Sequence, residues 1–361
     1  MLELNVTKQL GDFTLDANLK APAQGVTALF GQSGSGKTSL LRMLAGLDRP
    51  EHGLICIDDT VFVDTERRLF IPPHKRRLGV VFQEALLFPH YSVRGNLEYG
   101  MAVGAKAEFD MLVELLGIEH LLGRMPGVLS GGEARRVAIG RALLTKPRML
   151  LMDEPLTGLD GARKQELLSY IMRLTHEVDI PVLFVSHDTQ EVMAIADRLA
   201  LVEKGRVVAS GELGAMLTQS ELSAQLGGFA ATSLLKARWT AHDDMTGLSW
   251  FELDDGQRLA LSRVECVADD ILHIQVNVHD VALALSRPTG TSFINMLDAE
   301  IEALTEGQQG GVELTLRLGD QCLRAQVTPY VADALGLREG LPVIALIRSA
   351  SLARQRRSRA S

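Results

Sequence analysis

The stretch VTALFGQSGSGKTSLLRMLAGL, residues 26–47, contains an apolar run, a glycine-rich loop and a second apolar run. The run from Val26 predicts a buried strand, and the leucines at positions 40, 41, 44 and 47 predict an amphipathic helix. Gly31, Gly36, Lys37 and Thr38 match the pattern G-x-x-x-x-G-K-[ST] between them. The order strand, loop, helix predicts a phosphate-binding site on an α/β fold.

The residues of this loop are the candidate nucleotide contacts: Gly31, Gln32, Ser33, Gly34, Ser35, Gly36, Lys37 and Thr38. Glycines let backbone N–H groups converge on phosphates, and the helix N-terminus adds the positive end of its dipole. Lys37 would reach the β- and γ-phosphates, and Thr38 would bind Mg²⁺.

Other apolar runs end in polar side chains. In RMLLMDEP, residues 148–155, the apolar run is followed by Asp153 and Glu154. VLFVSHD, residues 182–188, contains His187, and LGVVFQE, residues 78–84, contains Gln83. Ligands of open α/β sheets collect at the carboxyl ends of the strands. We expect Asp153 to bind Mg²⁺ with Thr38 and Gln83. We expect Glu154, His187 and Gln83 to form the catalytic set, in which Glu154 is the general base toward water and His187 donates to the γ-phosphate.

A glycine pair lies within LSGGE, residues 129–133, before the helical pattern EARRVAIGRALL. Ser130 and the bare amides of Gly131 and Gly132 would form an anion site at a helix N-terminus. A turn is the alternative for Ser-Gly-Gly taken alone.

These motifs, in this order over about the first 210 residues, resemble the ATP-binding subunits of ATP-binding-cassette (ABC) transporters. The resemblance implies that ATP is the nucleotide and that two subunits pack head to tail. In this family, LSGGE corresponds to the signature motif. Each signature would then contact the ATP of the partner, through Leu129, Ser130, Gly131, Gly132 and Glu133. Asp160 in TGLD would lie in a loop at the dimer interface, and Glu133 stands where the family usually has glutamine. Phe13 is the candidate for stacking on adenine, with a core phenylalanine as the alternative.

Residues 84–146 predict a mainly helical subdomain. By resemblance, this subdomain receives a short helix from the membrane-embedded subunit. The residues that would line the groove for this helix are Phe88, Pro89, His90 and Tyr91. A local core is the competing interpretation for Phe88.

After residue 210 the pattern changes to short alternating runs such as GLSWFELDDGQRLAL and VELTLRL, which predict a small all-β, OB-like barrel region. From Thr291 the sequence resembles a molybdate-binding barrel module, and the whole chain resembles the ATP-binding subunit of a bacterial molybdate ABC importer. Ser292 and Ser349 are the candidate oxyanion contacts. Ile294 stands where relatives often carry arginine, so a purely structural clamp between two subunits is the alternative.

The expected domains are therefore an ABC ATPase domain, a β-rich connecting part, a molybdate-type barrel and a basic tail. Their ranges are 1–230, 231–290, 291–355 and 356–361 respectively.

Composition limits the function further. The chain of 361 residues is 46% hydrophobic and 23% charged, with a net charge of −8, so a general nucleic-acid surface is not expected. The N-terminus lacks the apolar core of a signal peptide, and no apolar run is long enough to span a membrane. We expect a peripheral protein on the cytoplasmic face of the inner membrane.

The sequence thus predicts an ATPase that drives oxyanion import, most closely that of molybdate. Its expected partners are a second copy, two membrane-spanning permease subunits and, indirectly, an extracytoplasmic binding protein. Sulfate or tungstate as cargo, a soluble ABC ATPase acting on nucleic acid or the ribosome, and a molybdate storage or sensing protein are the alternatives.

Overall fold

The computed structural model describes residues 1–11, 13–178, 180–218, 232–264, 271–306 and 310–356. The chain divides into two compact units, Met1–Leu213 and Gly214–Ser361. The expected domain boundary near residue 230 and the basic tail beyond Arg356 lie outside the described residues.

The first unit contains an antiparallel sheet in the order β2-β1-β4-β5-β6. Its strands are β1 (Leu2–Leu10), β2 (Phe13–Ala21), β4 (His52–Ile57), β5 (Thr60–Asp64) and β6 (Leu69–Phe70). In β2, buried and exposed side chains alternate, as expected where one face of a sheet meets a core.

A second sheet has the order β11-β10-β3-β9-β8-β7, in which only β11 is antiparallel to its neighbour. Its strands are β3 (Val26–Phe30), β7 (Leu78–Val81), β8 (Met149–Asp153), β9 (Val182–Ser186), β10 (Arg198–Glu203) and β11 (Arg206–Glu212). All residues of β3, β8 and β9 are buried, because both faces of this sheet are covered.

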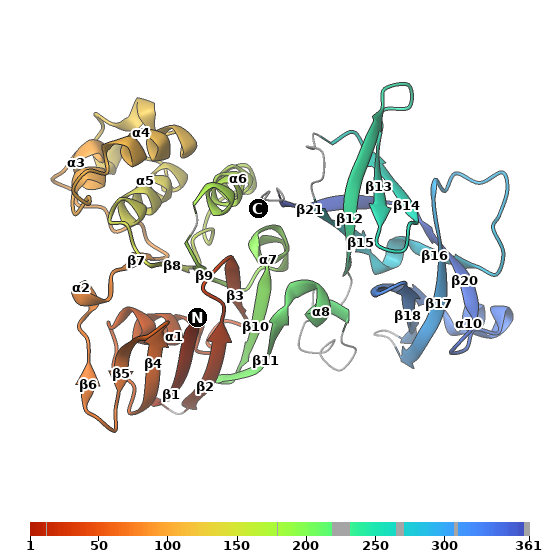
Figure 1. Ribbon diagram of the computed structural model, residues 1–361, viewed down its shortest axis with the longest axis horizontal. Helices are drawn as coiled ribbons and strands as arrows, with labels where there is room; N and C mark the ends of the chain where they lie inside the picture. The colour runs from red at the N-terminus through yellow and green to blue at the C-terminus, as the bar shows by residue number, and fades with distance from the viewer. Residues whose placement is uncertain (12, 179, 219–231, 265–270, 307–309, 357–361) are drawn as a thin grey trace. The chain divides into compact units, whose positions relative to one another are not determined.

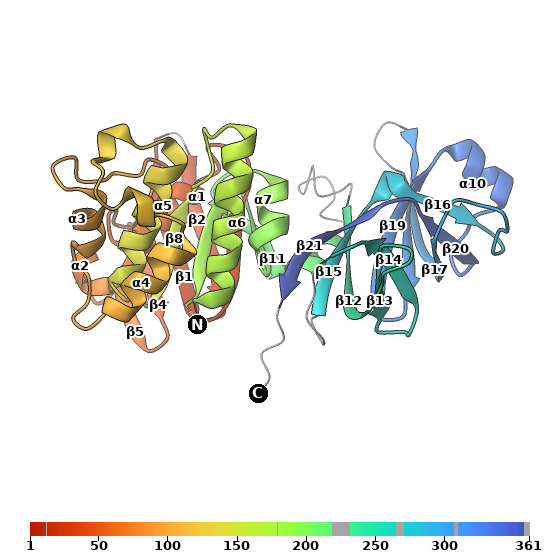
Figure 2. The same ribbon diagram turned by 90° about the horizontal axis from the view of Figure 1, so that it is seen from above.

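The helices of this unit are α1 (Lys37–Ala45), α2 (Pro73–Arg76), α3 (Val93–Glu98), α4 (Lys106–Leu115), α5 (Gly131–Leu144), α6 (Gly161–Glu177) and α7 (Thr189–Ile195). Short 3-10 helices span Glu119–Leu121 and Pro126–Val128. In Figure 1, α3, α4 and α5 gather in a lobe away from the antiparallel sheet. Helices α6 and α7 lie side by side (Figure 2).

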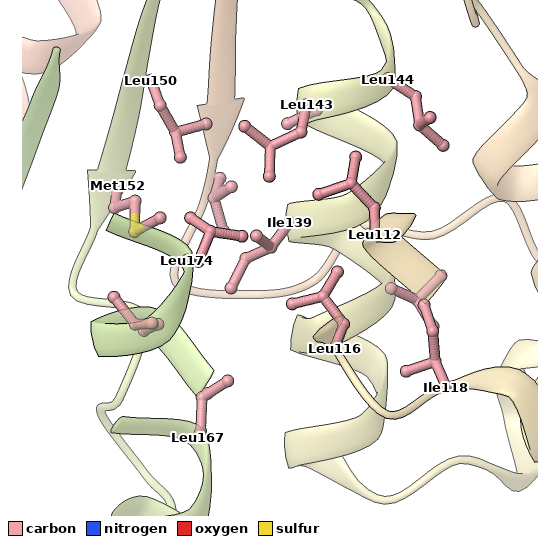
Figure 3. Packing of buried hydrophobic residues seen from close by; sticks show 14 of the residues in the cluster. Leu112, Leu116, Ile118, Ile139, Leu143, Leu144, Leu150, Met152, Leu167 and Leu174 are labelled. Carbon is pink, nitrogen blue, oxygen red and sulfur yellow. The ribbon is translucent and has the colours of Figure 1, made fainter. Parts of the chain in front are cut away.

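Alternate residues of β8 enter different cores. Met149 and Leu151 join the core that contains α1 and the antiparallel sheet. Leu150 and Met152 join the core that contains the helical lobe and α6. Figure 3 shows Ile139 and Leu143 of α5 near Leu150 and Leu174, so α5 links the lobe to the parallel sheet.

The end of α1 is closed by a buried cation. Gly46 has φ 81°, and the Arg76 guanidinium donates to the carbonyls of Met43 (2.8 Å) and Leu44 (2.7 Å). Arg76 also lies over the rings of Phe62 and Phe70. Burial lowers the pKa of Arg76 to about 10, which leaves it charged at neutral pH.

The second unit contains two antiparallel sheets around one core. The first, in the order β14-β13-β12-β15-β21, contains β12 (Thr232–Asp243), β13 (Leu248–Leu253), β14 (Arg258–Ser262), β15 (Ile271–Asn277) and β21 (Ala350–Arg356). The second, in the order β16-β20-β17-β18-β19, contains β16 (Val281–Ala284), β17 (Asn295–Glu306), β18 (Val312–Leu318), β19 (Gln321–Val327) and β20 (Pro342–Ile347). The helices described in this part are α8 (Leu213–Thr218), the 3-10 helix Val278–Asp280 and α10 (Pro329–Leu335).

Two strands cross between the expected segments of this unit. β21, from the expected barrel, pairs with β15 of the expected connecting part, and β16 of the connecting part pairs with β20 of the barrel. The described residues between 232 and 356 therefore form one interleaved β structure. The predicted fold class, an α/β P-loop domain with a helical subdomain followed by an all-β region, is confirmed.

Candidate functional site: a nucleotide site at the carboxyl edge of the parallel sheet

The phosphate loop joins β3 to α1. At Gly31, an added Cβ would lie 2.1 Å from the carbonyl oxygen of Val202, and Gly36 has φ 102°. Glycine is therefore required at both positions, by close backbone approach at the first and by a left-handed conformation at the second. The loop ends at the N-terminus of α1, where free backbone amides suit an anion.

Lys37 is folded back onto its own loop. Its amine donates to the carbonyls of Gly31 and Gln32, each at 2.8 Å, and only 3% of the residue is exposed. Burial lowers the pKa of Lys37, and the carboxylates of Glu154 and Asp153 partly oppose this shift. A phosphate group would supply the negative charge that this buried cation lacks.

Asp153, at the end of β8, accepts a hydrogen bond from Thr38 Oγ1 at 2.9 Å. The carboxylate is buried, and burial raises the pKa of Asp153 while the Thr38 hydroxyl opposes the rise. A hydroxyl and a carboxylate are hard oxygen donors that Mg²⁺ prefers. No group of three or more His, Cys, Asp or Glu residues within the described chain forms a protein-only metal site. The donor set thus fits a Mg²⁺ ion that is also held by nucleotide phosphates.

Glu154 has a left-handed backbone, with φ 45°, which is unusual for a residue other than glycine. Its N–H donates to the carbonyl of Val185 at 3.1 Å, so β9 fixes this turn. Oε2 accepts from Thr157 Oγ1 at 3.0 Å, and Oε1 lies 3.3 Å from Nδ1 of His187. Strain of this kind persists only where surrounding contacts impose it, and it gathers at functional sites.

Gln83 is exposed and follows β7, which neighbours β8 in the sheet. The backbone carbonyl of Gln83 accepts hydrogen bonds from Arg135 of α5, from Nε at 3.3 Å and from Nη2 at 3.1 Å. The same Nη2 also donates to the carbonyl of Thr157. Arg135 and Thr157 are site residues that motif reasoning missed, because their role depends on contacts between distant segments.

The signature residues form the start of α5. Ser130 is the N-cap and accepts from the Glu133 N–H at 3.3 Å, while Glu133 Oε2 accepts from the Ser130 N–H at 2.7 Å. This reciprocal pair is a capping box. The backbone contact with Ser130 lowers the pKa of Glu133, so the carboxylate is ionised at neutral pH.

Asp160 is the N-cap of α6 and accepts from the Arg163 N–H at 3.1 Å. One turn later, the Lys164 amine lies 2.5 Å from Asp188 and 2.8 Å from Glu191. Asp188 caps α7 directly after His187. Lys164, which sequence reasoning did not select, therefore joins the helix after the Asp160 loop to the helix after His187.

The aromatic segment expected to receive a membrane subunit is held by Asn96, which is fully buried. Asn96 accepts from the Phe88 N–H and donates to the carbonyls of Phe88, Tyr91 and Ser92. Phe88 is half-buried, with its ring 4.4 Å from that of Tyr99, whereas Pro89, His90 and Tyr91 are exposed. Phe88 thus anchors a segment whose neighbouring side chains face outward.

Phe13 lies beside the phosphate loop. Its Cζ is 3.6 Å from where a Cβ on Gly36 would stand, and the ring is partly buried against the core of the first unit. The ring therefore packs against the core beside the nucleotide loop, and its stacking on adenine stays a prediction.

The candidate oxyanion contacts in the second unit are both exposed. Ser349 Oγ donates to Asp280 Oδ2 at 2.6 Å, so one of the two hydroxyls already faces a carboxylate. Ile294 is 58% exposed.

Comparison with known proteins gives the class first. The family model described as ABC transporter matches residues 15–157, and that described as TOBE domain matches residues 291–353. The structure resembles cbiO1 from Clostridium perfringens, part of the ABC transporter complex cbiONQ. That match has a TM-score of 0.53 and 26% identity, and it covers 62% of this chain and 93% of that one. A dimeric ATP-binding cassette, solved after hydrolysis with ADP and Pi, matches with a TM-score of 0.50 and 26% identity, and it covers 59% of this chain and 99% of that one.

Relatives that match along the whole chain are more specific. A molybdenum import ATP-binding protein of Pectobacterium atrosepticum is 47% identical, covering 98% of this chain and 99% of the relative. Those of Yersinia pseudotuberculosis and Escherichia coli are 46% and 45% identical, covering 98% of this chain and 98% and 99% of the relatives. The chain belongs to this family, the molybdenum import ATP-binding proteins.

Proposed function

We propose that this chain hydrolyses ATP to drive the import of molybdate, as the ATPase subunit of an ABC transporter. The geometric observation that carries the proposal is the pair Glu154 and His187, 3.3 Å apart at the ends of neighbouring strands and beside the Thr38–Asp153 contact. The match to molybdenum import proteins along 98% of the chain supports molybdate over sulfate as cargo, and import over action on nucleic acid.

The hydrolytic step rests on Glu154. One of its oxygens is held by the Thr157 hydroxyl, so the other would accept a proton from the water that attacks the γ-phosphate. His187, which is exposed to 45%, would contact both Glu154 and the γ-phosphate and so fix the water between them. Lys37 would leave the loop carbonyls to neutralise the β- and γ-phosphates.

Mg²⁺, when bound, would neutralise charge on the phosphates. Thr38, Asp153 and Gln83 are the residues that would hold it.

The assembly that we propose is a homodimer bound to two permease subunits, with an extracytoplasmic binding protein acting indirectly. A solved cassette with the same fold is dimeric. Ser130, Gly131 and Gly132 would then contact the partner's ATP, with Asp160 at the same interface. None of the helices in the described residues is long and apolar enough to cross a membrane. We place the subunit on the cytoplasmic face of the inner membrane, held there by the permease.

For the barrel, we propose oxyanion contacts at Ser292 and Ser349. The match to molybdenum import proteins along 98% of the chain and the exposure of both serines support this role. Asp280 opposes an anion at Ser349, so binding requires that the Ser349–Asp280 contact opens.

The Glu154→Gln variant tests the function. The amide cannot accept a proton while the phosphate loop is intact, so ATP hydrolysis by the assembled transporter should fall by at least about 100-fold. Nucleotide affinity in a direct titration should stay within about twofold, because Lys37 and the loop are unchanged. Wild-type turnover in this variant would exclude Glu154 as the base, and a wild-type complex with no ATP-dependent molybdate uptake would contradict the function as a whole.

A further inference from the structure

The guanidinium of Arg135 connects helix α5 to two other segments of the nucleotide site, those of Gln83 and Thr157. Arg135 donates to the carbonyl of Gln83 through Nε and Nη2, at 3.3 and 3.1 Å, and to the carbonyl of Thr157 through Nη2. The two acceptors belong to different segments, the loop after β7 and the turn after β8. A planar, forked donor is suited to holding two such acceptors in a fixed relation.

Thr157 also contacts Glu154, the proposed general base. Its hydroxyl donates to Glu154 Oε2 at 3.0 Å, and its N–H donates to the Glu154 carbonyl at 3.2 Å. Residues 154–157 therefore form a closed turn. A shift of the Thr157 carbonyl would move the Glu154 carboxylate with it.

Arg135 belongs to the same helix as the signature. It lies in the first turns of α5, whose N-cap is Ser130. A regular helix transmits a displacement of its first turn to a residue one turn further on. Burial of the guanidinium lowers the pKa of Arg135, and its hydrogen-bond acceptors here are carbonyls, so its contacts depend on geometry rather than on charge pairing.

We propose that Arg135 is a positioning residue that sets Glu154 according to how the signature helix and the Gln83 segment are seated. The inference rests on the proposed function, in which the signature contacts the ATP of the partner. Binding at one ATP site then adjusts the base of the other site, because Ser130 serves the partner's nucleotide and Arg135 holds the Glu154 turn of its own chain. Arg135 makes hydrolysis at the two sites interdependent.

The test is ATP hydrolysis by the assembled transporter as a function of ATP concentration. In Arg135→Ala, kcat should fall by about tenfold, because a misplaced base slows the chemical step. The ATP concentration at half-saturation should change by less than about twofold, because the phosphate loop is untouched. The Hill coefficient should fall toward one. Arg135→Lys should recover only part of kcat, because an ammonium lacks the fork that contacts both carbonyls.

Arg173→Ala is the matched control. Arg173 is exposed on the neighbouring helix α6 and stacks over the Tyr170 ring, 4.7 Å from its centroid. This variant should keep wild-type kcat and Hill coefficient. Melting temperatures of all variants separate a loss of folding from a loss of positioning.

Three results would overturn the inference. The first is an unchanged kcat and Hill coefficient in Arg135→Ala. The second is a fall in kcat matched by an equal loss of ATP affinity and a lower melting temperature, which would indicate a structural role. The third is full recovery in Arg135→Lys. A wild-type complex without ATPase activity would instead contradict the proposed function, and the inference with it.

Discussion

The Glu133 side chain is held by a hydrogen bond from the backbone of Ser130. The Ser130 N–H donates to Oε2 at 2.7 Å, and this contact lowers the pKa of Glu133. Glutamine, the usual residue here, reaches back to an N-cap amide in the same way. The carboxylate differs in carrying a charge that the N-terminal end of the α5 dipole favours.

This difference predicts a pH dependence. Since the folded-state pKa of Glu133 lies below the ordinary value of 4.5, its charge stabilises the fold above about pH 4.5. That contribution is lost as pH falls through the lowered pKa. We expect the wild type to exceed Glu133→Gln in free energy of unfolding by about 0.3–1 kcal/mol at pH 7, and the difference to shrink in acid. Urea unfolding of both chains from pH 7 downward measures it, and a difference that is constant with pH would contradict the assignment.

At the scale of single elements, the C-terminus of α1 depends on a residue far along the chain. The carbonyls of Met43 and Leu44 accept from Arg76, and Gly46 closes the helix in a left-handed conformation. A Cβ on Gly46 would lie 2.7 Å from both Cζ and Nε of Arg76. The helix that begins with Lys37 and Thr38 is thus fixed at its other end by a buried cation.

Gly46→Ala should therefore destabilise the protein by about 1–3 kcal/mol, through the positive φ and through displacement of Arg76. Gly123→Ala is the control, because no atom lies within 4 Å of its added Cβ and it needs no left-handed backbone. Urea unfolding monitored by circular dichroism compares the two. Equal stability of the two variants would show that Arg76 does not hold the end of α1.

At the scale of the whole molecule, the interleaved strands of the second unit make the barrel inseparable from the strands that precede it. Removing residues from Thr291 onward would take away β20 and β21, the partners of β16 and β15. The remaining strands would lose about half of the buried residues of their common core. Point variants are the sound test of oxyanion binding.

Molybdate bound at the barrel would favour a dimer arrangement that opposes closure of the two ATP sites. It should therefore inhibit ATP hydrolysis by the transporter. Asp280→Asn removes the carboxylate that faces Ser349, and should lower the molybdate concentration for half-inhibition by about tenfold. Ser292→Ala and Ser349→Ala should raise it. Inhibition curves that coincide in all four proteins would leave the barrel as a structural clamp between subunits.

Much of the nucleotide site could be predicted from sequence, because its parts are local. The phosphate loop needs glycines at fixed spacing, the carboxylates follow a buried strand directly, and the signature precedes its helix directly. Parallel strands end at one edge, so the sequence predicts Gln83, Glu154 and His187 at the same edge without knowledge of any contact.

Contacts between distant segments were decided only by the tertiary structure. Arg135 looks like any polar residue in a helix until Gln83 and Thr157 present their carbonyls to it. Lys164 contacts Asp188 only because α6 packs on α7, and the pairing of β15 with β21 joins a strand of the expected connecting part to a strand of the expected barrel. The physical reason is the same in each case. A short motif encodes backbone geometry within a few residues, whereas a side chain finds a carbonyl or a strand finds a neighbour only after the chain has packed.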